Sequence, residues 1–419
     1  MTEFYDALEH RDPAVREARL MAALPHQVAA ALKTPAFAER FAGVDAAGVT
    51  SREALASLPV TRKHELLERQ KAERAHDPFG GFSAIGWQSL HGRNGAQRVF
   101  QSPGPIYEPE GRARDYWRTA RALWAAGFRA GDLMHNSFSY HLTPAGSMLE
   151  SGAHAIGCTV FPGGVGNTEL QLQAMVELRP DGYAGTPSFL RIALEKAAET
   201  GISLPSLKKA MVSGEAFPAA LRDWLRTRGL EAYQSYATAD VGLIAYETAA
   251  REGLVLDEGV IVEIVRPGTG DPVPPGEVGE VVVTVLNADY PLVRFGTGDL
   301  SATLAGHCPT GRTNTRIKGW MGRADQTAKV RGMFVHPGQV AEVLKRFPEA
   351  GRGRLVISGE MANDQMTLQV ETASSAESLT QRMAEAIREV TKLRGDVALC
   401  APGSLPNDGK VIDDTRSVG

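Results

Sequence analysis

The sequence has few cysteines, no excess of positive charge and no long apolar run. Its 419 residues include three cysteines, and 45 lysines and arginines stand against 49 aspartates and glutamates, a formal charge of −4. Three widely separated thiols argue against a disulfide framework or a CxxC pair. The slightly acidic balance gives no cationic field for nucleic acid or an anionic membrane. Neither is therefore an expected partner.

The N-terminus shows no targeting signal. The first twenty residues carry charges throughout and lack the apolar core of a secretion signal. No later run approaches the roughly 18 apolar residues that a membrane-spanning helix needs. We therefore expect a cytoplasmic protein without export or membrane attachment.

The apolar residues divide the chain into regions of different pattern. Residues 3–73 show a helical spacing, and residues 131–201 alternate short apolar runs with helical stretches, which is typical of a largely parallel sheet. Residues 260–286 are rich in β-branched residues around a Pro/Gly turn. The sequence predicts an α/β fold: a large multi-layer N-terminal domain with an α/β part and a β-rich lobe over residues 1–321, and a small α+β C-terminal domain over residues 322–419.

Two charged residues follow glycine-containing turns. Lys410 follows Asn-Asp-Gly, where an exposed ammonium suits a developing phosphate or carboxylate charge, although a solvated lysine near the terminus is the commoner interpretation. Asp299 follows Gly-Thr-Gly, and its carboxylate can accept from two ribose hydroxyls. A structural aspartate in a glycine turn is equally consistent with that pattern.

Two other stretches carry polar and aromatic groups. Tyr236 offers an aromatic face and Asp240 a hard oxygen ligand for Mg²⁺, against the alternatives of a core tyrosine and a helix-capping aspartate. The stretch SGEAF, residues 213–217, follows an apolar run. It is expected to be a loop after a strand, where ligands often bind.

Five motifs in order resemble the signatures of the adenylate-forming (AMP-binding) enzyme superfamily, most closely its phenylacetate-CoA ligase family. They are SGEAF, YATADVG, RFGTGDL, GRADQTAKVRG and LPNDGK, and the similarity runs from LPVTRKHEL at residue 58 to residue 416. The ordered set is much more specific than any one motif. The resemblance implies a large N-terminal domain and a small C-terminal lid domain.

The resemblance also implies roles for single residues. Asp299 would hold the ribose hydroxyls, Asp240 would bind Mg²⁺ where the family usually has a glutamate, and Lys410 would contact carboxylate and phosphate during adenylation. Arg323, also assigned to the nucleotide, and Asp325 would lie at the interdomain hinge. Rotation of the small domain would then bring the GRADQTAKVRG loop towards the thiol of coenzyme A.

Two pockets follow from the same resemblance. The adenine pocket would be lined by Ser213, Gly214, Glu215, Ala216, Gln234, Ser235, Tyr236 and Ala237. The acyl pocket would be lined by Tyr140, Pro144, Ala145, Gly146, Gly185, Thr186 and Pro187. The second set predicts an apolar slot of the size of an aryl group.

The chain departs from the family pattern at a zinc site. Many members have cysteines and a histidine that bind a structural zinc ion, and here the matching places read Thr248, Val255 and Thr310, with Cys308 alone retained. One thiolate does not make a four-ligand site, so no structural zinc is expected.

The second departure is at the phosphate loop. The family reads S-S-G-T-T-G-K-P before a tyrosine-containing segment, whereas residues 89–105 read SLHGRNGAQRVFQSPGP. Gly92 and Gly95, with Arg93 or Arg98, would present N–H groups and charge to a phosphate, or the segment is an eroded connector. Both interpretations stay open at this point, and the retained Asp299 and Lys410 favour some nucleotide chemistry.

The sequence therefore predicts an ATP- and Mg²⁺-dependent ligase that activates an aromatic or arylacetic carboxylic acid as its acyl-adenylate and transfers it to coenzyme A. One alternative is an adenylating enzyme of secondary metabolism with another acceptor. The other is a catalytically silent homologue that binds a ligand. A homodimer is common among the proteins that the chain resembles.

Overall fold

The computed structural model describes residues 4–86, 95–324, 326, 328–330, 333–359, 364–374 and 377–416. The chain divides into two compact units. Unit 1 comprises Met1–Val262, Val283–Thr297 and Leu304–Trp320, and unit 2 comprises Glu263–Val282, Gly298–Thr303 and Met321–Gly419. Both units combine helices with sheets, which confirms the predicted α/β class. Within the described ranges, no helix is long and apolar enough to cross a membrane.

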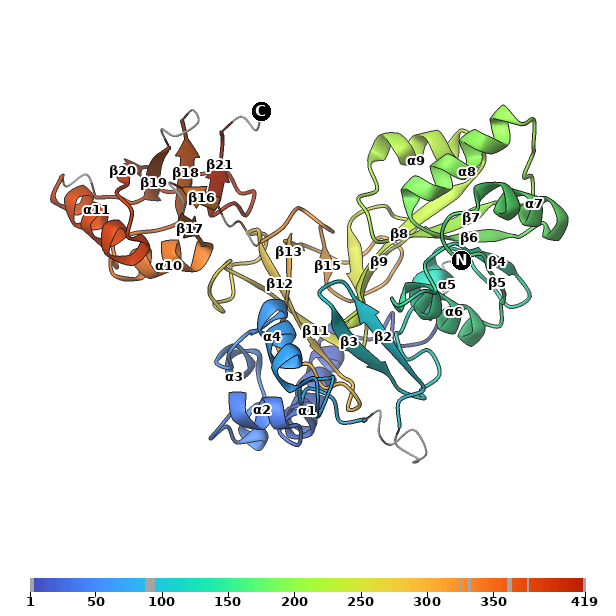
Figure 1. Ribbon diagram of the computed structural model, residues 1–419, viewed down its shortest axis with the longest axis horizontal. Helices are drawn as coiled ribbons and strands as arrows, with labels where there is room; N and C mark the ends of the chain where they lie inside the picture. The colour runs from blue at the N-terminus through green and yellow to red at the C-terminus, as the bar shows by residue number, and fades with distance from the viewer. Residues whose placement is uncertain are drawn as a thin grey trace. The chain divides into compact units, whose positions relative to one another are not determined.

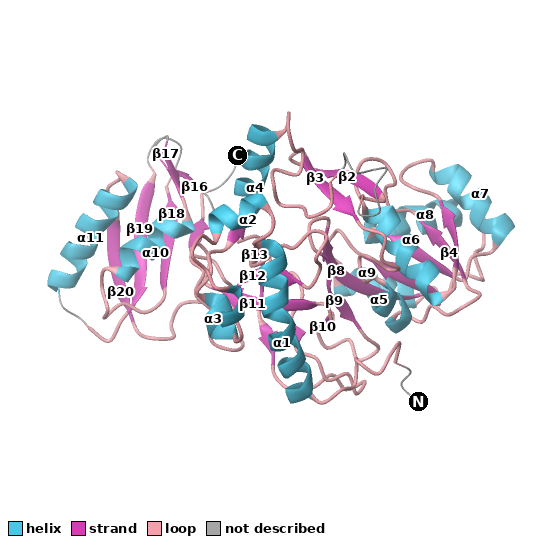
Figure 2. Ribbon diagram, turned by 90° about the horizontal axis from the view of Figure 1, so that it is seen from below, coloured by secondary structure: helices cyan, strands magenta, loops and turns pink. Residues whose placement is uncertain are grey.

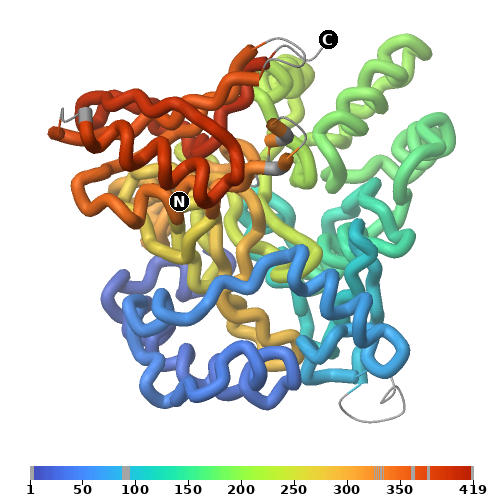
Figure 3. Tube along the Cα trace, turned by 60° about the vertical axis from the view of Figure 1, so that its left-hand side comes forward, coloured from blue at the N-terminus to red at the C-terminus, as the bar shows by residue number. Residues whose placement is uncertain are grey.

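Unit 1 begins with a run of helices, blue in Figure 3. They are α1 (Pro13–Ala31), α2 (Pro35–Arg40), the 3₁₀ helix η1 (Ala46–Gly48), α3 (Arg52–Ala56) and α4 (Lys63–Glu73). Asp12 caps α1 by accepting from two backbone N–H groups, and Pro13 occupies its first turn. Leu24 and Val28 are fully buried. The helical pattern of the first 73 residues is thus confirmed.

A nine-stranded sheet forms the centre of unit 1, in the order β14-β15-β10-β9-β8-β7-β6-β4-β5. Its strands are β4 (Leu133–Asn136), β5 (Thr159–Pro162), β6 (Gly182–Gly185), β7 (Lys209–Val212), β8 (Glu231–Thr238), β9 (Gly242–Glu247), β10 (Leu254–Leu256), β14 (Thr303–Leu304) and β15 (Arg316–Ile317). Strands β5, β4, β6, β7 and β8 pair in parallel. Of these, β4, β5 and β6 lie in residues 131–201, for which the sequence predicts a parallel sheet. Strands β8, β9, β10 and β15 continue it with antiparallel pairs.

Helices cover both faces of the parallel part, giving three layers (Figure 1). They are α5 (Ala120–Ala125), α6 (Ala145–Ile156), α7 (Thr168–Leu178), α8 (Pro187–Glu199) and α9 (Ala219–Arg226). Met134 and Met211 pack with α5 and α6, whereas Tyr183 and Val212 pack with α7, α8 and α9. Alternate strand residues thus face opposite apolar layers, and this explains the continuous apolar runs of these strands.

Two smaller sheets also include residues of unit 1. A four-stranded sheet has the order β1-β13-β12-β11, and a separate two-stranded hairpin joins β2 to β3. The strands are β1 (Thr61–Arg62), β2 (Arg98–Ser102), β3 (Ile106–Glu110), β11 (Val260–Val265), β12 (Gly279–Val285) and β13 (Phe295–Ser301). The predicted β-rich segment over residues 260–286 is confirmed by β11 and β12.

The C-terminal part of unit 2 is a small α+β assembly (Figure 2). Its elements are β16 (Ala328–Val330), β17 (Met333–Val335), α10 (Pro337–Lys345), β18 (Gly353–Ser358), β19 (Gln365–Glu371), α11 (Glu377–Thr391), β20 (Asp396–Cys400) and β21 (Ile412–Asp414). Its four-stranded sheet has the order β20-β19-β18-β21. Leu355, Ile357 and Leu368 of the sheet share one core with Val343 of α10 and Met383 of α11.

Candidate nucleotide and acyl site

The predicted pocket residues of unit 1 gather where parallel strands end. Strands β6, β7 and β8 end at Gly185, Val212 and Thr238, and Val212 lies opposite Gln234 in the register. Ser235, Tyr236 and Ala237 therefore extend beyond the end of β7. The carboxyl edge of such a sheet is the usual place for a ligand.

Ser213 ties three of these strand ends together. Its hydroxyl donates to the Ser235 carbonyl at 2.8 Å, and its N–H donates to the Gly185 carbonyl at 3.3 Å. Gly214, Glu215 and Ala216 follow it and are exposed. The motif SGEAF is thus a surface loop at the carboxyl end of β7, as its pattern predicts.

Two further contacts connect this edge to its neighbours. Glu215 Oε2 accepts from the backbone N–H of Ser188, at the first turn of α8, at 3.3 Å. The half-buried Tyr236 donates its hydroxyl to Thr297 Oγ1 at 3.1 Å. Tyr236 is therefore held at the junction of β8 and β13, with the orientation of its ring fixed by the hydroxyl contact.

Tyr140 is anchored at the predicted acyl pocket. Its hydroxyl donates to Glu150 Oε2 at 2.7 Å and accepts from Asn136 Nδ2 at 2.8 Å. Burial raises the pKa of Tyr140, and the hydrogen bond to Glu150 raises it further, so the phenol stays protonated. A Cβ at Gly146 would lie 2.8 Å from the Tyr140 ring and from the Ser139 carbonyl. The glycine is needed for this close approach.

The remaining acyl-pocket residues begin two helices at the same sheet. Pro144 caps α6, and Ala145 and Gly146 are its first residues. Thr186 caps α8 by accepting from the Phe189 N–H at 3.3 Å, and Pro187 begins that helix. Both helices start beside the carboxyl ends of β4 and β6. These residues share one edge of the sheet, and their assignment to an acyl pocket stays a prediction.

Asp299 lies in unit 2, next to Arg323. Arg323 Nη1 donates to Asp299 Oδ1 at 2.9 Å, and the two residues form a backbone bridge. Gly298 has a φ of 73°, and a Cβ there would lie 2.5 Å from the Arg323 guanidinium. The Gly-Thr-Gly-Asp segment is part of β13, and not the turn that the sequence predicts, and its glycine at 298 accommodates an arginine that faces the carboxylate. Asp325, the predicted hinge residue, lies outside the described residues.

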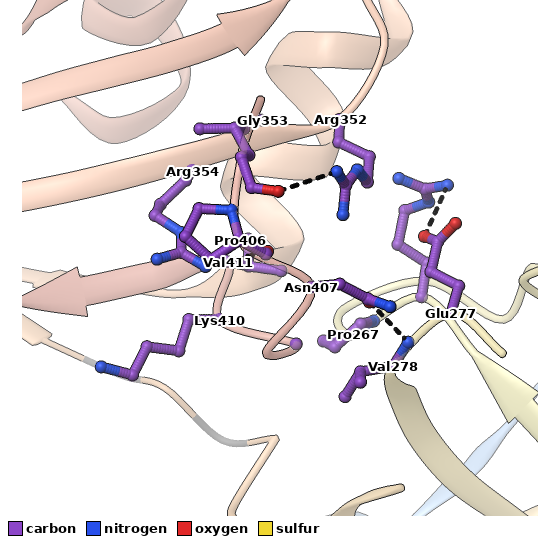
Figure 4. A pocket seen from close by; sticks show the side chains of 13 residues that line it. Pro267, Glu277, Val278, Arg352, Gly353, Arg354, Pro406, Asn407, Lys410 and Val411 are labelled. Atoms are coloured by element: carbon purple, nitrogen blue, oxygen red, sulfur yellow. Dashed lines mark hydrogen bonds and ion pairs between the residues drawn. The ribbon is translucent and has the colours of Figure 1, made fainter. Parts of the chain in front are cut away.

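Lys410 also belongs to unit 2, and its ammonium donates to Asp413 Oδ1 at 2.7 Å. The turn before it is fixed: Gln326 Nε2 donates to the Gly409 carbonyl at 2.9 Å, and Asn407 Oδ1 accepts from the Val278 N–H at 3.0 Å. Figure 4 shows the Lys410 side chain extending away from the Asn407 turn. The exposed ammonium is therefore carried on a rigid turn.

Lys410 borders a hollow that several arginines line. Arg352 is paired with Glu371 at 2.9 Å, and Arg354 is paired with Asp408. Because each of these two guanidiniums has a carboxylate partner, we assign no anion to the hollow.

The second half of residues 89–105 forms a tight hairpin turn. Residues 87–94, which include Gly92 and Arg93, lie outside the described residues, and Arg98 begins β2. Ser102 pairs with Ile106, so Pro103, Gly104 and Pro105 alone connect β2 to β3. The prolines have no N–H, and the Ser102 N–H and hydroxyl both donate to Glu108. This turn therefore lacks the row of donors that a phosphate loop presents.

Two buried acidic residues, Glu108 of this hairpin and Asp240, interact electrostatically. The Asp240 side chain is 1% exposed, and its Oδ2 accepts from Lys63 Nζ at 3.0 Å. Its Oδ1 is buried without a hydrogen-bond partner among the described residues. Glu108 is fully buried, and the charge of Asp240 contributes to its raised pKa.

These contacts do not fit the predicted Mg²⁺ site at Asp240. Mg²⁺ keeps several of its waters and needs accessible oxygen ligands, whereas both Asp240 oxygens are buried and one is already paired with an ammonium. Across the described residues, no cluster of three or more histidine, cysteine or acidic side chains is placed to hold a metal ion. No step of the chemistry is therefore assigned to a protein-bound metal.

Glu108 is expected to make stability fall as pH rises. Burial, and then the Asp240 charge, raise its pKa to about 8, whereas an unfolded glutamate titrates near 4.3. The folded chain thus keeps a proton between these values, and the stabilisation present at acid pH is lost as pH rises through about 8, by at most about 1.4 kcal/mol per pH unit. Thermal unfolding between about pH 6 and 9 should show a steeper loss for wild type than for Glu108→Gln. Equal slopes would contradict this assignment.

Two family models match the chain. The model of the AMP-binding enzymes matches residues 118–285, and that of the AMP-binding enzyme C-terminal domain matches residues 332–415. Phenylacetate-coenzyme A ligase of Thermus thermophilus is 31% identical over 85% of this chain and 82% of its own length. The chain belongs to the phenylacetate-coenzyme A ligase family of AMP-binding enzymes. As a member of that family, it is an AMP-forming acyl-CoA ligase by class.

Other relatives of the phenylacetate-coenzyme A ligase family agree with this placement. The enzyme of that name from Aromatoleum evansii is 30% identical over 87% of this chain and 84% of its own. An open conformation of 2-hydroxyisobutyryl-CoA ligase, in complex with 2-HIB-AMP and CoA, has a TM-score of 0.71 at 25% identity and covers 95% of this chain and 90% of that one. The fold of the chain is therefore that of adenylate-forming ligases.

The former zinc positions of the phenylacetate-coenzyme A ligase pattern lie together in unit 1. Cys308 Sγ is 3.2 Å from Thr248 Oγ1 and 3.1 Å from Thr310 Oγ1, and Val255 is buried in β10. One thiol and two hydroxyls are not a zinc ligand set. The absence of structural zinc stays a prediction. In this structure, Cys308 and the two threonines form a hydrogen-bonded cluster at these positions.

Sequence reasoning did not single out Lys63, Glu108 or Glu150. Lys63 stands in the family-like stretch LPVTRKHEL, and the charge at the first turn of a helix gave no sign of a partner far along the chain. Glu108 stands in a short strand just before Pro109, where a glutamate is normally exposed. The one available signal for Glu150 was its position four residues after Gly146, a spacing that places two residues on one face of a helix such as α6.

Proposed function

We propose that the chain activates an aromatic or arylacetic carboxylic acid with ATP and transfers the acyl group to coenzyme A. A carboxylate oxygen attacks the α-phosphorus of ATP, the bond to the β-phosphate oxygen breaks, and pyrophosphate leaves. The thiol sulfur of coenzyme A then attacks the acyl carbon, its proton is released, and AMP leaves. Two anions must approach each other in the first step, so cationic groups have to offset their repulsion.

The arrangement around Tyr140 and Ser213 carries this proposal. Tyr140 is fixed by Asn136 and Glu150 beside the ends of β4 and β6, and Ser213 ties the end of β7 to Gly185 of β6. An aromatic slot and an adenine loop on neighbouring strands suit an acyl-adenylate that spans both. The names of the phenylacetate-coenzyme A ligase relatives support an aryl acid.

In unit 2, the proposed roles are those that the sequence predicts. Asp299 holds the ribose hydroxyls, with Arg323 beside it, and Lys410 neutralises charge on the reacting oxygens during adenylation. The rigid turn before Lys410 favours this role, because a cation on a fixed backbone costs less entropy to position.

The test is pyrophosphate release from ATP with a panel of benzoic, phenylacetic and short aliphatic acids, followed by addition of coenzyme A. We expect release with aryl acids above the aliphatic ones, and an acyl thioester on addition of coenzyme A. Release without thioester would favour another acceptor. No release with any acid, despite ATP binding, would favour a silent ligand-binding homologue.

A further inference from the structure

We propose that Asp240 is a buried counter-ion that positions the Lys63 ammonium for an anionic oxygen of the nucleotide, and that Asp240 does not ligate a metal ion. The inference rests on the proposed function, because it assumes that ATP binds at this edge of unit 1. It differs from the role that family resemblance implies for Asp240.

The first support is the position of Lys63 beside two nucleotide motifs. Strand β1 pairs in parallel with β13, with Thr61 opposite Phe295 and Arg62 opposite Gly296. Continuing this register brings Lys63, the first residue of α4, level with Thr297. Thr297 accepts the hydrogen bond from Tyr236, so Lys63 stands where β8 and β13 meet.

The second support is the difference in burial within the ion pair. The Lys63 side chain is 39% exposed, whereas that of Asp240 is 1% exposed. The ammonium has three N–H donors, and one of them points to Asp240 Oδ2. The carboxylate thus holds the ammonium on its buried side, and the solvent-facing side of the ammonium stays accessible to a ligand.

The third support is the shortage of other phosphate donors at the hairpin. The turn at Pro103, Gly104 and Pro105 has two residues without N–H, and Ser102 is used by Glu108. Gln70 of α4 also bonds both backbone groups of Tyr107, at 2.9 and 2.8 Å. These bonds lock the helix that carries Lys63 to the hairpin, so the ammonium occupies a fixed place next to it.

The test compares the affinity of each variant for ATP and for adenosine by calorimetry in EDTA. Lys63→Met should weaken ATP binding by about 10- to 100-fold, the loss of a charge-assisted hydrogen bond, and leave adenosine binding unchanged. Lys71→Met is the matched control: it removes a lysine of the same helix that pairs with Glu68 on the surface at 2.9 Å. That control should bind both ligands as wild type does.

A second variant covers the risk that Lys63→Met misfolds because Asp240 is left buried and unpaired. The double variant Lys63→Met/Asp240→Asn removes both charges and should show the same selective loss of ATP affinity. Asp240→Asn alone keeps the Lys63 ammonium but holds it less firmly, so this variant should lose less ATP affinity than Lys63→Met. Wild-type ATP affinity in the double variant would overturn the inference.

The claim that Asp240 does not ligate a metal ion is tested separately with Mn²⁺ and electron paramagnetic resonance. Without nucleotide, wild type and Asp240→Asn should leave the free Mn²⁺ signal equally unchanged. A wild-type protein that depletes the signal, with a variant that does not, would make Asp240 a metal ligand. If wild type forms the thioester and the Lys63 variants keep wild-type ATP affinity, the inference about Lys63 is overturned and the proposed function stands. If wild type binds no ATP, the proposed function is overturned as well.

Discussion

Replacing Lys410 with alanine is expected to slow acyl-adenylate formation by about 100- to 1,000-fold, the usual effect of removing one donor that stabilises transition-state charge. The ammonium is half exposed on a turn that Gln326 and Asn407 hold in place. Thioester formation from isolated acyl-adenylate and coenzyme A should change little, because no carboxylate then has to approach a triphosphate. Single-turnover assays of the two half-reactions measure this difference.

Lys345→Ala is the matched control for this experiment. Lys345 is an exposed lysine at the end of α10 in the same unit, and its loss should affect neither half-reaction. Equal loss in both half-reactions for Lys410→Ala would contradict a role confined to adenylation, and full adenylation activity would remove the assignment.

The ion pair between Lys410 and Asp413 is weak enough for a ligand to compete for the Lys410 ammonium. The two side chains are 50% and 21% exposed, and exposed pairs contribute only about 0.2–1 kcal/mol. A phosphate oxygen can therefore replace Asp413 as partner at small cost. The pair orients the lysine without immobilising it.

The second large effect is expected at Asp299. Asp299→Ala should weaken AMP binding by about 100-fold, because two hydrogen bonds to a carboxylate contribute about 1.5 kcal/mol or more each. Wild type should bind 2′-deoxy-AMP and 3′-deoxy-AMP more weakly than AMP, and the variant should bind all three alike. Calorimetry with the three nucleotides on wild type and on Asp299→Ala measures both effects.

Asp396→Ala is the control, since Asp396 is an exposed aspartate at the start of β20 in the same unit. Folding of Asp299→Ala is expected to be unimpaired, because the Arg323 guanidinium that contacts Asp299 is 51% exposed and stays solvated. If the variant still prefers AMP to the deoxy nucleotides, the carboxylate does not contact the ribose.

Local sequence patterns were sufficient for most of the fold. The β-branched runs at residues 260–265 and 280–285 are strands, and the helical spacing of Leu379, Met383 and Ile387 is that of α11, whose apolar face is buried. The strand-to-loop transition at Ser213 also followed from an apolar run that ends in small and polar residues. These features depend on neighbours in the chain, and short-range periodicity records them.

The pairing of Lys63 with Asp240 was beyond such reasoning, because 177 residues separate the two side chains. Glu108 is similar: it belongs to a hairpin whose strands form a sheet of their own, and its pKa is raised by burial and by the charge of Asp240, which lies in the turn between β8 and β9. The residue pattern predicts one division of the chain, near residue 321, whereas unit 2 also includes Gly298–Thr303 and with it Asp299. The predicted division at residue 321 stays a prediction.

The three-residue turn of the hairpin has a thermodynamic consequence. A long glycine-rich segment loses about 1–2 kcal/mol of backbone entropy for each residue that a ligand immobilises. Pro103 and Pro105 restrict the turn before anything binds, since their rings fix φ. A ligand that binds against this hairpin therefore immobilises little additional backbone. Calorimetry of such binding is expected to show only a small loss of conformational entropy.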